Sequence, residues 1–324
     1  MGTRGEGSLN GSLDGVVSEA AEVHLVDLLE RGERSVTSGY LIAAPQPALV
    51  EAGSALSVPV WLETLAHLGI APADVAYVVV THIHLDHAGG AGILLRHLKN
   101  AQVVVHQRGA RHLVDPSRLV AGARGVFGEH LEAYYGVPEP VPPGRLLVPG
   151  PGDQLDLGGG HRLRFFDAQG HARHQHVIMD DGPGCLFGGD EFGKQIVAIA
   201  DDYLLPDTPP TEFDPAAWAR SIELLLTLRP QAVLLAHFGR CALDCDALGR
   251  RLREQVEAFA GLGRAGTGAL SWEEVHPRLV EHVRHDLAAR GVEWTPTIEH
   301  ELSEELGVWA KGIADYHARR SRPG

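Results

Sequence analysis

The fold of this chain is decided by ten residues, Thr81-His82-Ile83-His84-Leu85-Asp86-His87-Ala88-Gly89-Gly90. They follow the apolar run Val78-Val79-Val80, and three imidazoles and one carboxylate fall within six positions. Lone pairs aimed at one region are favourable only if a cation lies there, because desolvation and repulsion are otherwise costly. His82 and His84 are two apart, so an extended backbone projects them to one side. Asp86 and His87 reach a second point nearby, and the spacing therefore predicts two metal ions.

A structural cluster without metal is the alternative interpretation. The chain contains 19 histidines among 324 residues, so an isolated histidine carries little information. A His-x-His-x-Asp-His arrangement between an apolar run and Gly89-Gly90 is far more specific. Because buried polar groups need partners, a metal site is the simpler explanation of this arrangement.

The motif resembles the signature of the metallo-β-lactamase-fold hydrolase superfamily. Three further segments resemble the other motifs of that family, in the same order: Gly170-His171-Ala172-Arg173-His174, Leu186-Phe187-Gly188-Gly189-Asp190 and Val233-Leu234-Leu235-Ala236-His237-Phe238-Gly239. The first of these is similar to a Gly-His-Ala-x-His branch of uncharacterised hydrolases. The resemblance covers about residues 20–260 and implies an αββα sandwich, in which two sheets are faced by helices. The alternation of strand-like and helical segments by itself indicates only α/β layering.

The resemblance also implies seven metal ligands. His82, His84 and His171 would hold one ion, Asp86, His87 and His237 the other, and Asp190 would lie between them. Imidazole and carboxylate suit zinc best, and iron or manganese accept the same ligands. In the family, two such ions share a hydroxide and polarise the substrate, while Asp86 would carry a proton to the leaving group.

The implied function is hydrolysis of a small acyl substrate (an ester, thioester, lactone or amide) by a metal-bridging hydroxide. The alternative is an iron-dependent redox enzyme on the same fold, similar to sulfur dioxygenases, since these ligands also suit iron. Gly193 stands where acyl-homoserine lactonases carry a tyrosine, three residues after the bridging aspartate, which disfavours that branch. The sequence has no clear basic cluster for glutathione, which disfavours thioesterases of the glyoxalase II type.

Residues near the motifs provide further candidates. His174, three positions after His171, is predicted to lie close to the metals, and the alternative is plain packing. His112 either hydrogen-bonds a substrate oxyanion or a metal ligand, or packs at a helix end; it lies in segment 106–150, which we expect to contact substrate. Glu51 stands where the family usually has aspartate, and either orients metal ligands from outside or is a solvated turn residue.

Composition limits the kinds of partner and the cellular compartment that we expect for this protein. The 42 acidic and 28 basic residues give a net charge of −14, which disfavours nucleic-acid enzymes because these need a basic surface. No apolar stretch reaches the ~18–20 residues of a membrane helix, and the N-terminus lacks the apolar core of a signal peptide. We therefore expect a cytoplasmic enzyme acting on a small molecule, without membrane or nucleic-acid partners.

The chain divides into three predicted parts: a disordered tail (1–17), a catalytic domain (18–262) and a C-terminal helical extension (263–324). Glycine-rich residues 261–268 are expected to form a hinge before the extension. Strands are predicted at 21–28, 39–42, 47–53, 75–80 and 103–105, and helices at 58–68, 92–99, 216–228, 272–289 and 298–319. The two last helices are expected to form a lid or a homodimer interface, and packing against the core is the alternative.

Overall fold

The computed structural model describes residues 16–20, 22–266 and 268–321. Most of the predicted tail, residues 1–15, lies outside this range, while its last two residues, Val16 and Val17, begin the first strand. No helix of the described residues is long and apolar enough to cross a membrane.

Two β-sheets form the centre of the molecule. The first contains seven strands, in spatial order β1 (Val16–Ala20), β2 (Val23–Asp27), β3 (Ser38–Ile42), β4 (Ala48–Val50), β5 (Tyr77–Val79), β6 (Gln102–Val104) and β7 (Leu146–Leu147). The second contains six, in spatial order β15 (Gly239–Arg240), β14 (Ala232–Leu235), β11 (Cys185–Gly189), β10 (His176–Asp180), β9 (His161–Asp167) and β8 (Gln154–Gly158). Strands β4 to β7 run parallel, as do β11 and β14, and the other neighbours are antiparallel.

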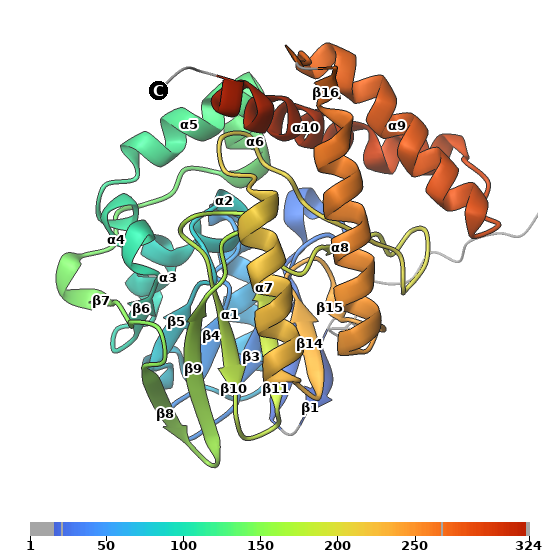
Figure 1. Cartoon of the computed structure of the whole chain (residues 1–324). Coiled ribbons are helices and arrows are strands. Elements are labelled where there is room, and N and C mark those ends of the chain that lie inside the picture. Colours follow the sequence, from blue (N-terminus) through green and yellow to red (C-terminus); the bar gives the residue numbers. More distant parts are fainter. Residues whose placement is uncertain (1–15, 21, 267, 322–324) are drawn as a thin grey trace, which may run out of the picture.

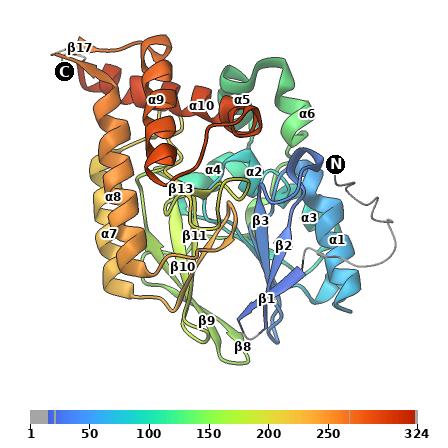
Figure 2. The same ribbon diagram turned by 90° about the vertical axis from the view of Figure 1, so that its right-hand side faces the viewer.

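Helices cover the outer face of each sheet, so the molecule has four layers (Figure 2). Helices α1 (Val58–His67) and α3 (Ala91–His97) pack on the first sheet, and α7 (Pro215–Leu228) and α8 (Cys245–Leu262) on the second. Successive residues of β5 alternate between layers: Val78 joins the helix-facing core and Val79 the core between the sheets. Burial on both faces explains the continuous apolar runs of these strands. The αββα sandwich is thus confirmed.

The predicted strands and helices correspond to β2 to β6, α1, α3, α7, α9 (Trp272–Ala289) and α10 (Pro296–Ser321). Capping side chains define where two of the helices begin. Asp214, directly before Pro215, accepts hydrogen bonds from the backbone amides of Ala216 and Ala217 in α7, and Asp244 accepts one from that of Ala247 in α8. Segment 106–150 contains three α-helices, α4 (Gln107–Val114), α5 (Ser117–Phe127) and α6 (Leu131–Tyr135).

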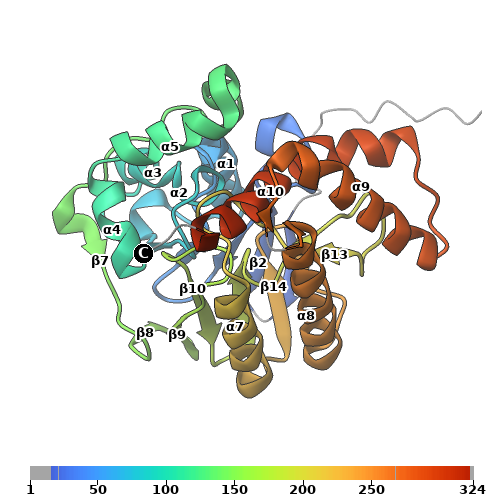
Figure 3. The ribbon, with the colours of Figure 1, turned by 45° about the horizontal axis from the view of Figure 1, so that its top comes forward.

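The C-terminal helices belong to the same hydrophobic core as α7 and α8. Buried Leu279 of α9 and Trp309 of α10 join Leu252 of α8 in this core. Instead of an open hinge, the glycine-rich stretch contains the end of α8 and a short hairpin, β16 (Arg264–Ala265) and β17 (Gly268–Ala269). Helix α10 crosses the end of the sandwich where α2 (Leu85–Ala88), α5 and α6 also lie (Figures 1 and 3).

Candidate metal centre

The His-x-His-x-Asp-His motif follows β5 and leads into the short helix α2. His84 is still extended and precedes the helix, while Asp86 and His87 lie inside it, so the chain turns between the two pairs as predicted. The glycines after α2 permit close packing. A Cβ atom on Gly90 would come within 2.8 Å of the carbonyl oxygens of Ala52 and Ser54, which explains why glycine is required there.

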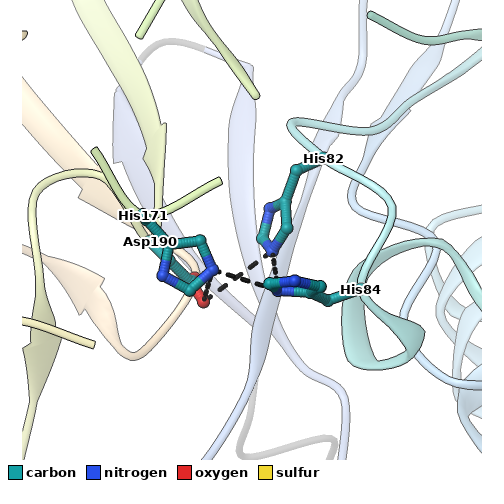
Figure 4. Close-up of side chains that lie close together, drawn as sticks. All are labelled: His82, His84, His171 and Asp190. Atoms are coloured by element: carbon teal, nitrogen blue, oxygen red, sulfur yellow. Dashed lines mark hydrogen bonds and ion pairs between the residues drawn. The ribbon is translucent and has the colours of Figure 1, made fainter. Parts of the chain in front are cut away.

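His82, His84 and His171 form the first group, which we call the imidazole cluster. His84 Nδ1 lies 2.9 Å from His82 Nε2 and 3.0 Å from His171 Nε2. Figure 4 shows the three rings converging beside Asp190, from segments of the two different sheets. A neutral imidazole has one donor and one acceptor nitrogen, so three converging rings are satisfied better by one cation than by each other.

Asp86, His87 and His237 form the second group, the carboxylate cluster. Asp86 Oδ2 lies 3.3 Å from His87 Nε2 and 3.4 Å from His237 Nε2. His237 follows β14, and Asp190 follows the parallel neighbour β11. Because parallel strands end at the same edge of a sheet, this pairing brings the last two motifs together.

Asp190 lies between the two clusters. Its Oδ2 is 3.5 Å from His171 Nε2 and 3.9 Å from His82 Nε2. Its Oδ1 is 3.4 Å from His87 Nε2 and 3.5 Å from His237 Nε2. One carboxylate therefore turns an oxygen to each cluster, and the structure brings all seven predicted ligands together.

Buried polar atoms without partners test whether these residues fit metal ions. His87 Nε2, His237 Nε2 and Asp190 Oδ1 face one another, are inaccessible to solvent and lack hydrogen bonds. Leaving such atoms unpaired costs about 1–3 kcal/mol each. Imidazole nitrogens and carboxylate oxygens are the donors that zinc, iron and manganese accept. The residues therefore form a His and Asp group able to bind metal.

Glu51 lies next to the carboxylate cluster but is not one of its predicted ligands. It is 1% exposed, which excludes the alternative of a solvated turn residue. Thr81 donates its Oγ1 hydrogen to Glu51 Oε1 at 2.5 Å and its amide to Oε2 at 3.2 Å, and His87 Nδ1 lies 3.4 Å from Oε1. The backbone of Glu51 is left-handed, with φ +64°, which is uncommon for a residue other than glycine.

Backbone carbonyls orient two of the other histidines. His171 Nδ1 donates to the carbonyl of Asp207 at 2.9 Å, and His237 Nδ1 donates to that of Val36 at 2.8 Å. Each of these bonds leaves Nε2 as the nitrogen with a free lone pair, which faces its cluster. The buried carboxylate of Glu191 accepts the amides of Gly170 and His171 at 2.9 and 3.0 Å, which holds the second motif in place.

The two clusters differ in protonation. Burial and the neighbouring histidines lower the pKa of His82 and His84 well below the ordinary range. Burial opposes the charged form of His87 too, but the carboxylates of Asp190, Asp86 and Glu51 outweigh it and raise the pKa of His87 well above that range. The pKa of His237 is also raised, because Asp190 and Asp86 outweigh burial and the charge of Lys194.

A cavity of about 360 Å³ opens onto the ligands, and His84, Asp86, His171 and Asp190 line it. His174 also lines it, with its ring centre 5.3 Å from that of His84. Burial lowers the pKa of His174 to about 4, and its buried Nδ1 has no hydrogen-bond partner. His112, in the last turn of α4, lies in the cavity wall outside both clusters and accepts a hydrogen bond from Arg111 at 3.1 Å.

Sequence reasoning missed several charged residues of the cavity. Lys194, in β12 (Lys194–Gln195), donates to Glu305 of α10 at 2.6 Å. Asp207 follows β13 (Leu204–Leu205), and its carboxylate accepts the indole N–H of Trp309 at 3.0 Å. Glu30 lies in a short 3-10 turn, Glu30–Gly32, where it is 4% exposed. Of these residues, Lys194 lies closest in sequence to a metal motif, four residues after Asp190.

Comparison with known proteins agrees with this architecture. The model of the metallo-beta-lactamase superfamily matches residues 32–237, more than half of the chain. The metallo-beta-lactamase fold-containing protein ST1585 of Sulfurisphaera tokodaii is 32% identical over 167 residues, which are 50% of this chain and 60% of that protein. The chain thus spans less than two thirds of the length of this relative.

Solved structures show the same fold. The archaeal superfamily protein ST1585 from Sulfolobus tokodaii has a TM-score of 0.61 at 21% identity, covering 86% of this chain and 93% of that structure. The family protein TTHA1429 from Thermus thermophilus has a TM-score of 0.66 at 20% identity, covering 94% of each. The match to the family model, which includes all seven predicted ligands, shows that the chain belongs to the metallo-beta-lactamase superfamily.

Proposed function

We propose that this protein is a metal-dependent hydrolase that cleaves a small acyl substrate (an ester, thioester, lactone or amide). The observation that carries the proposal is the position of Asp190, with one carboxylate oxygen toward the imidazole cluster and the other toward the carboxylate cluster. Two divalent ions, with zinc as the best match to the donor set, would be held by His82, His84, His171, Asp86, His87 and His237, with Asp190 shared. When bound, such ions supply a nucleophile at neutral pH and polarise the substrate oxygen.

Asp86 has the geometry of a proton carrier. It is the carboxylate of the second cluster, and its side chain is 19% exposed and lines the cavity, whereas Asp190 is only 2% exposed. Burial opposes its ionisation, but the neighbouring imidazoles of His87 and His237 outweigh burial and hold the pKa of Asp86 well below its usual range. Asp86 is therefore ionised at neutral pH and reaches the space where a leaving group would depart.

Helix α10 supports a lid role for the C-terminal extension. Glu304, Glu305 and Val308 line the cavity, and the Lys194–Glu305 pair joins this helix to the segment after Asp190. Such a cover limits the access of bulk water to the reacting group. The predicted homodimer through the C-terminal helices is a separate proposal, which a measurement of mass in solution would test.

Metal analysis followed by a substrate screen tests the proposed function. We expect two divalent ions per chain, and hydrolysis of model esters, thioesters or lactones that the chelator-treated protein lacks and added zinc restores. Asp190→Asn, purified in parallel, controls for contaminating hydrolases. A single iron per chain with no hydrolysis would instead favour the redox alternative, because this donor set also suits iron.

A further inference from the structure

Helix α5 presents an apolar stripe to the cavity. The residues of α5 that line it are Leu119, Gly122, Ala123, Val126 and Phe127, together with Arg118 at the start of the helix. Spacings of three and four residues place side chains on one face of a helix. No residue of α5 is buried, so this face is only partly covered by the described part of the chain.

The stripe is continuous with the metal centre. Ile83 and Leu85 alternate with the predicted ligands His84 and Asp86, and both line the same cavity. Leu85 packs with Leu131 and Tyr135 of α6 in a small hydrophobic cluster, against which Leu119 and Phe127 of α5 pack. An apolar wall therefore begins beside the ligands and extends along α5.

Another part of the cavity lining is charged, and two of its cations are paired within the protein. Lys194 pairs with Glu305, and Arg31 of the short 3-10 turn pairs with Glu304 of α10. Outside the predicted metal ligands, five carboxylates line the cavity, one of them the buried Glu30, and they outnumber the three cations Arg31, Arg118 and Lys194. This excess of carboxylates disfavours a substrate that carries a free carboxylate, and it favours a neutral one.

We propose that the α5 wall binds the acyl chain of the substrate, with the scissile carbonyl at the metal ligands and the chain along Leu119, Gly122 and Val126. This inference rests on the proposed function and specifies its substrate class, a neutral ester or thioester of a medium-length fatty acid. From Leu119 to Val126 the helix rises about 10 Å. Gly122 is the position where a chain comes closest to the helix backbone, because a Cβ atom there would meet no protein atom within 4 Å.

Two glycines of α5 provide a matched test. Gly122 lines the cavity and Gly125 does not, yet a Cβ atom on either would meet nothing within 4 Å. Gly122→Leu and Gly125→Leu therefore make the same gain in helix propensity, and at neither position does the added Cβ atom meet the protein. Only the leucine at 122 would occupy the path of an acyl chain.

The first measurement is kcat/KM for p-nitrophenyl acetate, butyrate, hexanoate and octanoate with the metal-loaded protein. We expect a rise of roughly three- to fourfold per methylene, until the chain outgrows the wall. Gly122→Leu should lower the octanoate-to-acetate ratio at least about tenfold, whereas Gly125→Leu should leave it unchanged. Equal ratios in all three proteins would overturn the inference. So would a rise seen only with longer alcohol groups of acetate esters, since the chain would then lie on the leaving group.

A binding measurement separates this inference from the proposed function. Calorimetric titration of the metal-free protein with octanamide should show binding with a negative heat-capacity change, absent with acetamide and with Gly122→Leu. If no ester is cleaved with any metal but octanamide still binds in this way, the hydrolase proposal fails and the apolar chain site stands. If acetate and octanoate esters are cleaved equally and octanamide does not bind, the chain site fails and the hydrolase proposal stands.

Discussion

The imidazole cluster and the carboxylate cluster share Asp190 but differ in their surroundings. Burial, together with the other imidazoles that are the nearest titratable neighbours of His82 and His84, keeps the pKa values of these two residues low. His87 instead lies between Asp86, Asp190 and Glu51, which outweigh burial and raise its pKa. His82 and His84 are therefore neutral before metal binds, while His87 and His237 in the carboxylate cluster hold protons that a metal must displace. The two ions should bind in distinct steps.

Replacement of the shared ligand should have the largest effect. Asp190→Asn leaves one oxygen and removes the charge that faces both clusters. Loss of an outer partner of a metal ligand costs roughly 10- to 100-fold, and loss of a shared ligand should exceed that in both metal affinity and kcat/KM. Metal content and ester hydrolysis measure the two effects, and a thermal melt verifies folding. Normal turnover with full metal content would contradict the shared role of Asp190.

Glu51→Gln should affect the two clusters differently. It removes a carboxylate 3.4 Å from His87 Nδ1, whereas Glu51 reaches the imidazole cluster only through Thr81, whose Oγ1 lies 3.1 Å from His82 Nδ1. We expect the affinity for the second metal equivalent to fall about 10- to 100-fold and that for the first to change little. Titration against a chromophoric chelator measures both. Exposed Glu63→Gln in α1 is the control, and an equal loss for both equivalents would show that Glu51 serves the whole site.

The pH dependence of metal binding should differ between the clusters. The raised pKa of His87 means that its proton contributes to the stability of the metal-free protein at low pH, and this contribution disappears as pH rises through the raised pKa. Metal binding requires neutral His87, so the increase in Tm on adding zinc should be larger at pH 8 than at pH 6. The second equivalent should also release more protons than the first. Proton release can be measured with a pH indicator in weak buffer. Equal release for both equivalents would contradict the predicted difference in protonation between the clusters.

The sequence predicted which residues come together in the two clusters but not the difference between the clusters. Ligand spacing is local: His82, His84, Asp86 and His87 lie on one turn, and each other motif ends a strand whose apolar run is visible. The outer partners are set by the tertiary fold. Glu51 reaches Thr81 across 30 residues, and nothing near it in sequence distinguishes a buried glutamate from a solvated one.

The part of the cavity that helix α10 covers was the least predictable from the sequence. Lys194 pairs with Glu305 and Asp207 with Trp309, across 111 and 102 residues, so no local pattern marks either pair. The glycine-rich stretch 261–268 is typical of a linker, yet Leu270 hydrogen-bonds back to Gly263 and closes a hairpin. Periodicity predicted α10 correctly as a helix, but only its packing shows that its residues line the cavity.

Replacement of His174 should have the smallest effect on activity. It tests whether a polar side chain beside the imidazole cluster contributes to catalysis. Its ring centre lies 6.1 Å from that of His82 and 5.3 Å from that of His84. With its pKa lowered to about 4 by burial, His174 is neutral above pH 5 and can act there only through hydrogen bonding. His174→Ala should lower kcat roughly tenfold with both metals retained, and His174→Gln, which keeps a donor, should recover part of that loss. The pH profile between 5 and 9 should keep its shape in both variants. Unchanged kinetics in His174→Ala would reduce His174 to packing, and metal loss from the imidazole cluster would make it a structural support of the ligands.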